Sequence, residues 1–384
     1  MKRFVAVMNI PSPYRLHLLG ELARQLEAKG IQFHCHFMNR GHKDRPTSWL
    51  NPKIPFAHTY WKNFGPDQHE FNPGLILKLM FSRPDYLLLG GVFDTFTNIA
   101  LSVLARAGTK ICWLEGNTKT PGCLTGPLGW FKRSLMGRCQ FAAVPSSDAA
   151  KYIGLHQALT KKQMPKPVYL PNLVDETRFG TKKGVGSRNE GVGVEEAPRP
   201  GTARGTGARR ICLIPARLEA VKGLVPFFEL LTPEMLKGWT IRLMGQGLLK
   251  AEIVATLEKR GIREFIEIVD YVPYDEMPQY YAAADLLLLP SLYDPNPLSV
   301  IEALHTGLAV AVSDRAGNVE EAVTEGRNGW VLPVLDREAF AAKLKEVFST
   351  DREMLLKMGE VSKKENARFW ETKGAIGRFV EGVI

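Results

Sequence analysis

The sequence has no run of about 18 uncharged apolar residues, the length that a membrane-spanning helix requires. The apolar segment near the N-terminus, within MKRFVAVMNIPSPYR, is too short for a signal peptide and continues directly into sequence typical of a folded domain. We therefore expect a protein of the bacterial-type cytoplasm, or one located at the cytoplasmic face of a membrane.

Cysteine is scarce, and its pattern argues against disulfides and zinc. The five cysteines are an odd number without a C-x-x-C pair, and Cys112 and Cys212 lie inside apolar, strand-like runs. His34 and His36 share one face of a strand, but no third metal ligand is nearby in the sequence. We predict small buried thiols in a reducing compartment, and no metal site.

Acidic residues are few in the N-terminal half. Residues 1–171 hold 22 Lys and Arg against 9 Asp and Glu, a net charge of +13, whereas residues 172–384 have a net charge of −3. Such a half faces either solvent or an anionic partner. Nucleic acid is not expected, because the basic residues are scattered and no nucleic-acid motif accompanies them.

Short apolar runs alternate with amphipathic stretches along the whole chain, which is typical of βαβ units and parallel sheets. Because 384 residues exceed one ordinary core, we predict an α/β protein with two Rossmann-like, doubly wound domains. The predicted divisions are an N-terminal domain, a connection, a C-terminal domain and a closing helix, at residues 1–171, 172–210, 211–367 and about 368–384. Within the connection, residues 181–210 contain seven glycines and almost no large apolar residue, which predicts a flexible insertion.

Ligands of open parallel sheets bind beyond the carboxyl ends of the strands, so the residues after each strand are the candidate site. Arg217 and Lys222, five residues apart across a turn that Gly223 closes, have the charges to bind a diphosphate. A solvated turn is the alternative interpretation. Gly245 permits a close backbone approach after the next strand, and Val272 follows the strand beyond it.

A helix start lies between two acids in SLYDPNPLSVIEALHTGLAVAVSD. We predict Asn296 as the N-cap and Pro297 as the first helical residue, with the free N–H groups near Leu298 and Ser299 suited to a phosphate. Asp294 precedes this start, and Glu302 lies about one turn inside the helix. Two acids so placed are suited to hold the hydroxyls of one extended ligand at two points.

Several segments, in order along nearly the whole chain, resemble the retaining glycosyltransferases of family 4, which have the GT-B fold. Asp294 and Glu302 resemble the two acids of the E-x7-E motif, and PARLEAVKG resembles the R-x4-K phosphate clamp. YLPNLVDETRF resembles the segment where the chain leaves the N-terminal domain, and RFWETKGAIGRFVEGV resembles the closing helix that crosses back onto it. The first acid departs from the pattern, because it is Asp rather than the usual Glu.

The resemblance implies the following roles. Arg217 and Lys222 would neutralise the diphosphate of a nucleotide sugar, Glu302 would hold the ribose diol, Val272 would lie beside the base, and Asp294 would bind hydroxyls of the transferred sugar. Backbone N–H groups at Leu298 and Ser299 would meet the distal phosphate. No metal or other cofactor is implied.

In the N-terminal half, the corresponding loops hold Ser12, Tyr14 and Arg15 after the first strand and Glu115 after a later one. The resemblance implies that the first three lie on the acceptor side and that Glu115 faces the donor sugar. A surface position is the alternative for Arg15. The segment CLTGPLGWFKRSLMGR pairs apolar with basic residues, which predicts either a membrane-dipping helix or a core helix with a basic outer face.

The predicted reaction is transfer of a sugar, with retention, from a UDP- or GDP-sugar to a hydroxyl of a glycan or lipid-linked acceptor in bacterial polysaccharide or glycoconjugate biosynthesis. An anionic membrane surface is a further expected partner. Two alternatives remain open: a non-catalytic sugar-nucleotide-binding protein, and a nucleotide-sugar epimerase of similar shape.

Overall fold

A computed structural model describes residues 1–41, 52–66, 69–119, 122, 124–180 and 209–384. The chain forms two compact units, and each is described by itself. Unit 1 comprises Met1–Val174 together with Trp370–Ile384, and unit 2 comprises Asp175–Phe369. The predicted insertion at residues 181–210 falls almost entirely outside the described residues.

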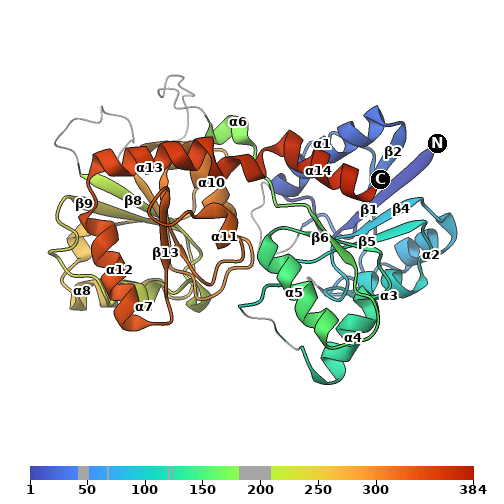
Figure 1. The fold of residues 1–384 in the computed structure, drawn as a ribbon, viewed down its shortest axis with the longest axis horizontal. Helices are drawn as coiled ribbons and strands as arrows, with labels where there is room; N and C mark the ends of the chain where they lie inside the picture. The colour runs from blue at the N-terminus through green and yellow to red at the C-terminus, as the bar shows by residue number, and fades with distance from the viewer. Residues whose placement is uncertain (42–51, 67–68, 120–121, 123, 181–208) are drawn as a thin grey trace. The chain divides into compact units, whose positions relative to one another are not determined.

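Unit 1 is built on a seven-stranded sheet in which every neighbouring pair is parallel, in the order β3-β2-β1-β4-β5-β6-β7 (Figure 1). Buried Val, Leu and Ala dominate its central strands, as expected for a sheet that is covered on both faces. The strands are β1 (Lys2–Met8), β2 (Ile31–Phe37), β3 (His58–Tyr60), β4 (Tyr86–Leu89), β5 (Thr109–Trp113), β6 (Phe141–Val144) and β7 (Lys166–Tyr169).

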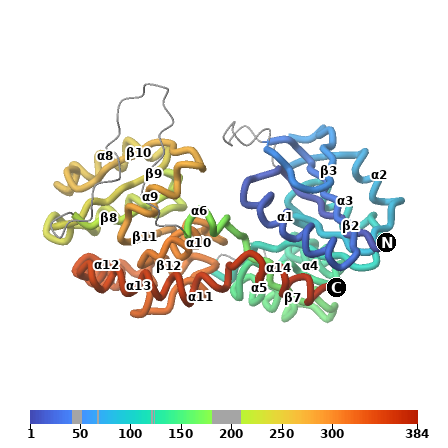
Figure 2. The backbone as a smooth tube through the Cα atoms, turned by 90° about the horizontal axis from the view of Figure 1, so that it is seen from above, coloured from blue at the N-terminus to red at the C-terminus, as the bar shows by residue number. Residues whose placement is uncertain are grey.

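Helices connect these strands in the βαβ manner. Helix α1 packs against the C-terminal helix α14, which also contacts β7, and both views show α14 alongside α1 (Figures 1 and 2). Helices α2, α3 and α4 form a consecutive series in which each contacts the next. The bounds are α1 (Pro13–Ala28), α2 (Pro73–Ser82), α3 (Phe96–Leu104), α4 (Gly126–Met136), α5 (Ser147–Ala158) and α14 (Thr372–Val383).

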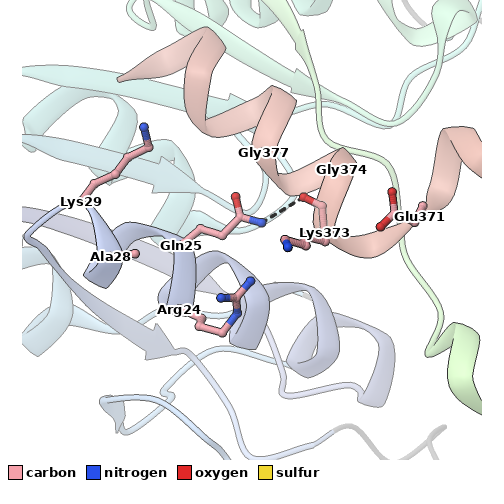
Figure 3. Close-up of a pocket in the computed structure, with 8 residues that line it drawn as sticks. All are labelled: Arg24, Gln25, Ala28, Lys29, Glu371, Lys373, Gly374 and Gly377. Atoms are coloured by element: carbon pink, nitrogen blue, oxygen red, sulfur yellow. Dashed lines mark hydrogen bonds between the residues drawn. The ribbon is translucent and has the colours of Figure 1, made fainter.

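A shallow pocket of about 480 Å³ lies where α14 meets α1. Figure 3 shows Gly374 and Gly377 on the α14 side, facing Gln25 of α1. The amide Nε2 of Gln25 donates to the carbonyl of Lys373 at 2.9 Å, which joins the two helices. The chain therefore returns to unit 1 through a packed helix, as predicted for the closing segment.

Unit 2 repeats the architecture with a six-stranded parallel sheet in the order β10-β9-β8-β11-β12-β13. Its strands are β8 (Arg210–Pro215), β9 (Trp239–Met244), β10 (Ile266–Val269), β11 (Leu286–Leu289), β12 (Ala309–Ser313) and β13 (Gly329–Leu332). Its helices are α6 (Glu176–Phe179), α7 (Leu224–Phe228), α8 (Lys250–Lys259), α9 (Met277–Ala283), α10 (Leu298–Thr306), α11 (Val319–Ala322), α12 (Arg337–Ser349) and α13 (Arg352–Lys364). The short 3-10 segments of this region are η2 (Ala220–Lys222), η3 (Arg263–Phe265) and η4 (Asn366–Trp370).

Each unit has its own apolar core. In unit 2, Trp239 of β9 is fully buried against Phe348 of α12, with ring centroids 5.4 Å apart. The tilted rings of Phe227 of α7 and Phe340 of α12 lie 6.4 Å apart. The alternation of strands and helices confirms the predicted pair of Rossmann-like domains. Cys35, Cys112, Cys139 and Cys212 are buried and unpaired, whereas Cys123 lies outside the described residues. In the described ranges, no helix is long and apolar enough to cross a membrane.

Candidate functional site

The candidate site of unit 2 lies at the point where the strand order reverses. Strands β8 and β11 are neighbours there, although the helices that follow them lead in opposite directions along the sheet. A crevice at such a reversal is the usual ligand site of an open parallel sheet. The loop after β8 carries Arg217 and Lys222, and the loop after β11 carries Asp294.

An ion pair joins the two loops. The ammonium Nζ of Lys222 lies 2.5 Å from Oδ2 of Asp294, and the two side chains are only 16% and 13% exposed. Backbone contacts hold the loops together as well, because the N–H groups of Leu292 and Tyr293 both donate to the carbonyl of Val221. A predicted phosphate-binding cation is thus placed directly against a predicted sugar-binding acid.

Arg217 has a different environment. Its guanidinium pairs with Glu219 at 2.9 Å, and the side chain is 64% exposed. The structure therefore gives Arg217 and Lys222 separate carboxylate partners. The expectation that both bind one diphosphate stays a prediction.

Helix α10 begins one residue later than we predicted. Pro297, with φ −66° and ψ 115°, is the N-cap residue, and the first helical residue is Leu298. The assignment of Asn296 as the N-cap was therefore wrong, because the extended backbone at Pro297 moves the cap position past Asn296. The proline side chain makes no capping hydrogen bond, so the first N–H groups of α10 receive no side-chain cap.

Unsatisfied polar side chains gather beside this helix start. Both side-chain polar atoms of Asn296 are buried without a hydrogen-bond partner among the described residues, and so is the hydroxyl of Ser291. Asn318 donates from Nδ2 to the carbonyl of Pro297 at 3.2 Å, but its Oδ1 is also unsatisfied. Buried polar atoms without partners are uncommon, and here Asn296 and Asn318 both adjoin Pro297 at the start of α10.

Glu302 lies inside α10, and its carboxylate is buried. Burial raises the pKa of Glu302 to about 7, although a hydrogen bond from the Tyr281 hydroxyl and the nearby charge of Arg178 act in the opposite direction. Burial and the neighbouring Glu302 carboxylate also raise the pKa of Tyr281. Such a carboxylate accepts further hydroxyl donors readily once it is ionised.

The backbone of the loop after β9 approaches the backbone of the loop after β8 at two glycines. Gly245 follows β9 with φ +147°, and a Cβ atom there would lie 2.1 Å from the carbonyl oxygen of Ala216. A Cβ at Gly247 would lie 2.4 Å from the carbonyl oxygen of Leu218. The loops after β8 and β9 therefore touch through their backbones.

Two further predicted residues are half-buried. Val272 follows β10, the next strand of the sheet, and Ser299 lies in the first turn of α10.

Unit 1 has a second cluster at the carboxyl ends of its strands. The Arg15 guanidinium lies over the Trp113 ring at 4.0 Å and pairs with Glu115 at 3.3 Å. The amide of Asn172 donates to the same Glu115 oxygen at 3.1 Å. The structure thus brings two of the predicted residues, Arg15 and Glu115, into direct contact.

Ser12 and Tyr14 flank the start of α1. Ser12 is the N-cap residue and is buried, and its carbonyl accepts from the N–H of Leu16 at 2.9 Å. Tyr14 is half-buried, with Arg15 above its ring at 5.7 Å. The geometry gives Ser12 a helix-capping position, and the acceptor-side assignments of both residues stay predictions.

Three residues that lie beside the predicted site residues were not among the candidates that the sequence indicated. Asn172 contacts Glu115, whereas Tyr281 contacts Glu302, with Arg178 nearby. Asn172 stands inside the PNLVD segment, which was a usable signal. Tyr281 had no such signal, because a tyrosine in α9 comes beside α10 only through the packing of the two helices.

The two units together have the GT-B fold. The structure is similar over 100% of the chain to HepE from Anabaena in complex with UDP, with a TM-score of 0.69, 15% sequence identity and 99% of that chain covered. It is also similar to WaaG, a glycosyltransferase involved in lipopolysaccharide biosynthesis, with a TM-score of 0.64, 14% identity and 99% of each chain covered. At these identities the likeness establishes the GT-B fold alone.

The sequence of unit 2 matches a family model. Residues 204–365 match the model of the family described as glycosyl transferases group 1. The chain is 28% identical over 148 residues to the putative colanic acid biosynthesis glycosyltransferase WcaL of Salmonella typhimurium, covering 36% of each protein. It is 30% identical over 192 residues to D-inositol 3-phosphate glycosyltransferase of Corynebacterium urealyticum, covering 45% of each protein. The chain thus spans less than half the length of these curated relatives.

Proposed function

We propose that this protein is a glycosyltransferase that moves a sugar from a nucleotide-diphosphate sugar to a hydroxyl of a glycan or lipid-linked acceptor. The observation that carries the proposal is the Lys222–Asp294 ion pair at the reversal point of the unit 2 sheet, beside the uncapped start of α10. A cation, a helix N-terminus and an acid so placed suit a phosphate joined to a polyhydroxylated group.

The same residues account for the parts of the proposed nucleotide-sugar donor. Lys222 and the first N–H groups of α10 stabilise the diphosphate, and Glu302 accepts hydrogen bonds from the ribose diol, while Asp294 accepts from hydroxyls of the transferred sugar. Solved GT-B structures of similar fold contain UDP or UDP-glucose, which supports a uridine nucleotide as the first donor to examine.

In the proposed reaction, the bond between the anomeric carbon and the leaving diphosphate oxygen breaks while the acceptor oxygen bonds to the same face of that carbon. The acceptor proton passes to the leaving phosphate. Lys222 and the α10 dipole stabilise the negative charge that develops on the diphosphate, so no metal ion is required. Retention at the anomeric carbon follows from attack on the face that the leaving group vacates.

A role in bacterial cell-surface polysaccharide or glycoconjugate biosynthesis fits the relatives, since the matched proteins include the colanic acid enzyme of Salmonella and O-antigen chain mannosyltransferase B of Escherichia coli. We accordingly propose action in the cytoplasm, with the acceptor at the inner face of the membrane.

The proposal is tested by incubating the protein, stripped of metal with EDTA, with a panel of UDP- and GDP-sugars and measuring nucleotide release. We expect slow release from one donor, and at least about tenfold less in Asp294→Asn and Lys222→Met. Lys357→Met, which disrupts an exposed ion pair with Glu353 on α13, is the matched control and should release nucleotide at the parental rate.

Release at the parental rate in both site variants would contradict the proposed donor site. Binding of a nucleotide sugar without turnover, with any acceptor tried, would favour a non-catalytic binding protein. Conversion of one nucleotide sugar into its epimer would favour the epimerase alternative. Once an acceptor is found, the anomeric coupling constant of the product tests retention.

A further inference from the structure

Tyr281 of α9 makes a contact that the proposed function leaves without a role. Its side chain is fully buried, and its hydroxyl donates a hydrogen bond to Oε2 of Glu302 on the neighbouring helix α10. A phenylalanine would fill nearly the same space and would bury no polar group. The hydroxyl is therefore not needed to fill the core, and its effect falls on the carboxylate that it contacts.

The ring of Tyr281 is fixed in place by its neighbours. Phe179 of α6 packs edge-on against it, with ring centroids 5.4 Å apart and an angle of 88° between the ring planes. Helices α6, α9 and α10 all contact one another, and Figure 2 shows α6 beside α10. Because three packed helices surround the tyrosine, its hydroxyl is held at one position against the carboxylate.

The hydrogen bond distinguishes the two oxygens of the Glu302 carboxylate. Oε2 accepts from Tyr281, whereas no donor among the described residues contacts Oε1. Glu302 keeps 7% of its surface exposed, and Oε1 is not one of the fully buried polar atoms that lack a partner. One oxygen is thus held inside the unit, and the other is left for a ligand. A carboxylate that is held at one oxygen cannot turn freely, so the second oxygen keeps one direction.

The charged and titratable groups around Glu302 come from three parts of unit 2. Tyr281 belongs to α9, Arg178 belongs to α6, and Tyr274 lies before α9. Arg178 pairs with Asp275 at 2.6 Å and lies over the Tyr274 ring at 4.6 Å. It acts on Glu302 through its charge, whereas Tyr281 contacts the carboxylate directly. Burial and the Glu302 carboxylate raise the pKa of Tyr281, so its hydroxyl keeps its proton and stays a donor.

We propose that Tyr281 is a positioning residue for nucleotide binding, which holds Oε2 of Glu302 so that Oε1 meets the vicinal hydroxyls of a ribose. The inference rests on the proposed contact between Glu302 and the ribose diol, and it adds the group that makes this contact selective. With Oε1 fixed, a ribonucleotide gains hydrogen bonds that a nucleotide without the diol cannot make. Without the Tyr281 hydroxyl, the carboxylate turns and more often carries a proton, so this gain is smaller.

The experiment compares the affinity of the full chain for UDP and for 2′,3′-dideoxy-UDP, with GDP and its dideoxy form as the second pair. We expect the parental protein to bind the ribonucleotide at least about tenfold more tightly than the dideoxy form. Tyr281→Phe should lose about tenfold of the affinity for the ribonucleotide and none for the dideoxy form, which has no diol to meet Glu302. Calorimetric titration above the pKa of Glu302 measures both affinities.

Three further variants separate positioning from packing. Tyr280→Phe removes the hydroxyl of the adjacent residue of α9, whose ring lies by Arg242 at 5.6 Å, and should leave both affinities unchanged. Phe179→Leu loosens the Tyr281 ring but keeps the hydroxyl, so it should lower the ribonucleotide affinity by less than Tyr281→Phe does. Glu302→Gln should lose the preference for the ribonucleotide, and adding Tyr281→Phe to it should cause no further loss, as expected for two residues that act through one contact.

The same contact can be measured without a nucleotide. Burial raises the pKa of Glu302 to about 7, and the hydrogen bond from Tyr281 limits that rise. Removing the hydroxyl in Tyr281→Phe should therefore raise the pKa of Glu302 above its parental value, whereas Tyr280→Phe should leave it unchanged. Carbon NMR of protein with labelled glutamate carboxyl groups follows the ionisation, and Glu302→Gln identifies the signal.

Tyr281 has no positioning role if Tyr281→Phe keeps the parental preference for the ribonucleotide, or if it weakens the binding of both nucleotides equally. An unchanged pKa of Glu302 in Tyr281→Phe would also overturn the proposal. Circular dichroism checks that each variant folds. If the parent binds neither UDP nor GDP, the donor assignment fails, and the ribose contact fails with it. If the parent prefers the ribonucleotide and Tyr281→Phe does so equally, the donor site stands and only the role of Tyr281 is lost.

Discussion

The ammonium of Lys222 lies 2.5 Å from the carboxylate of Asp294, although the two residues are 72 positions apart in the chain. The pair joins the loops after β8 and β11 and is largely shielded from water. A cation and an acid so joined form one electrostatic unit, in which each partner sets the position and charge of the other.

The first prediction concerns this pair. Asp294→Asn leaves Lys222 charged, half-buried and without its carboxylate, so we expect the free energy of unfolding to fall by roughly 2 kcal/mol. Urea denaturation measures the change. Glu353→Gln breaks an exposed Lys–Glu pair of 2.7 Å on α13 and should cost less than about 0.5 kcal/mol. If both substitutions lowered the free energy of unfolding equally, burial of the Lys222–Asp294 pair would not strengthen it.

The second prediction concerns the stability of the protein against pH. Burial raises the pKa of Glu302 from 4.5 to about 7. The folded protein therefore binds a proton that the unfolded chain has lost, so the contribution of Glu302 to stability is fully present below about pH 4.5 and is lost as the pH rises through about 7. In Glu302→Gln this loss should disappear, a difference on the order of 2–3 kcal/mol between the two proteins' pH profiles. Parallel profiles, measured by urea denaturation, would disprove the shift.

The third prediction concerns nucleotide binding. Hydroxyl groups that donate to Glu302 favour its ionised form, so binding of UDP or GDP should release a proton near neutral pH, and affinity should rise as the pH increases through about 7. Calorimetry in buffers of different ionisation enthalpy measures the proton release directly. Glu302→Gln should bind more weakly and should release no proton. Proton release that persists in that variant would point to another group.

The fourth prediction concerns the contact between the loops after β8 and β9. Gly245→Ala places a Cβ atom against the carbonyl of Ala216 in a backbone conformation of φ +147°, so we expect a loss of roughly 2–3 kcal/mol and weaker nucleotide binding. Gly261 is a matched control, because it has φ +65° with nothing within 4 Å of an added Cβ. Gly261→Ala should cost only about 1 kcal/mol and leave nucleotide affinity unchanged. Thermal unfolding and a nucleotide titration compare the two.

The fifth prediction concerns the cluster of unit 1. Arg15 stacks on Trp113 and pairs with Glu115, so Arg15→Lys keeps the charge but loses the planar stack. We expect kcat for sugar transfer to fall about tenfold, while KM for the nucleotide sugar stays near the parental value because the proposed phosphate contacts belong to unit 2. Arg106→Lys, at an exposed position, is the control. A raised KM with unchanged kcat would assign Arg15 to donor binding instead.

The sequence by itself determined the fold class and the order of the elements. Apolar runs of strand length alternating with amphipathic stretches leave few other solutions than two parallel sheets, since both patterns are local and repeat along the chain. It also singled out Lys222 and Asp294, because each follows a predicted strand, and Glu302, because it is an acid about one turn inside the predicted apolar helix. The exact start of α10 was not predicted correctly, since Asn296 and Pro297 both favour a helix N-terminus and only the backbone angles at Pro297 decide between them.

Only the tertiary structure decided which residues are partners. The contacts of Lys222 with Asp294, of Tyr281 with Glu302, and of Asn172 and Arg15 with Glu115 join residues from 21 to 100 positions apart. Such contacts depend on sheet order and helix packing, and no local pattern encodes either. The raised pKa of Glu302 has the same origin, because burial is a property of the packed unit and the sequence alone shows only a glutamate one turn inside an apolar helix.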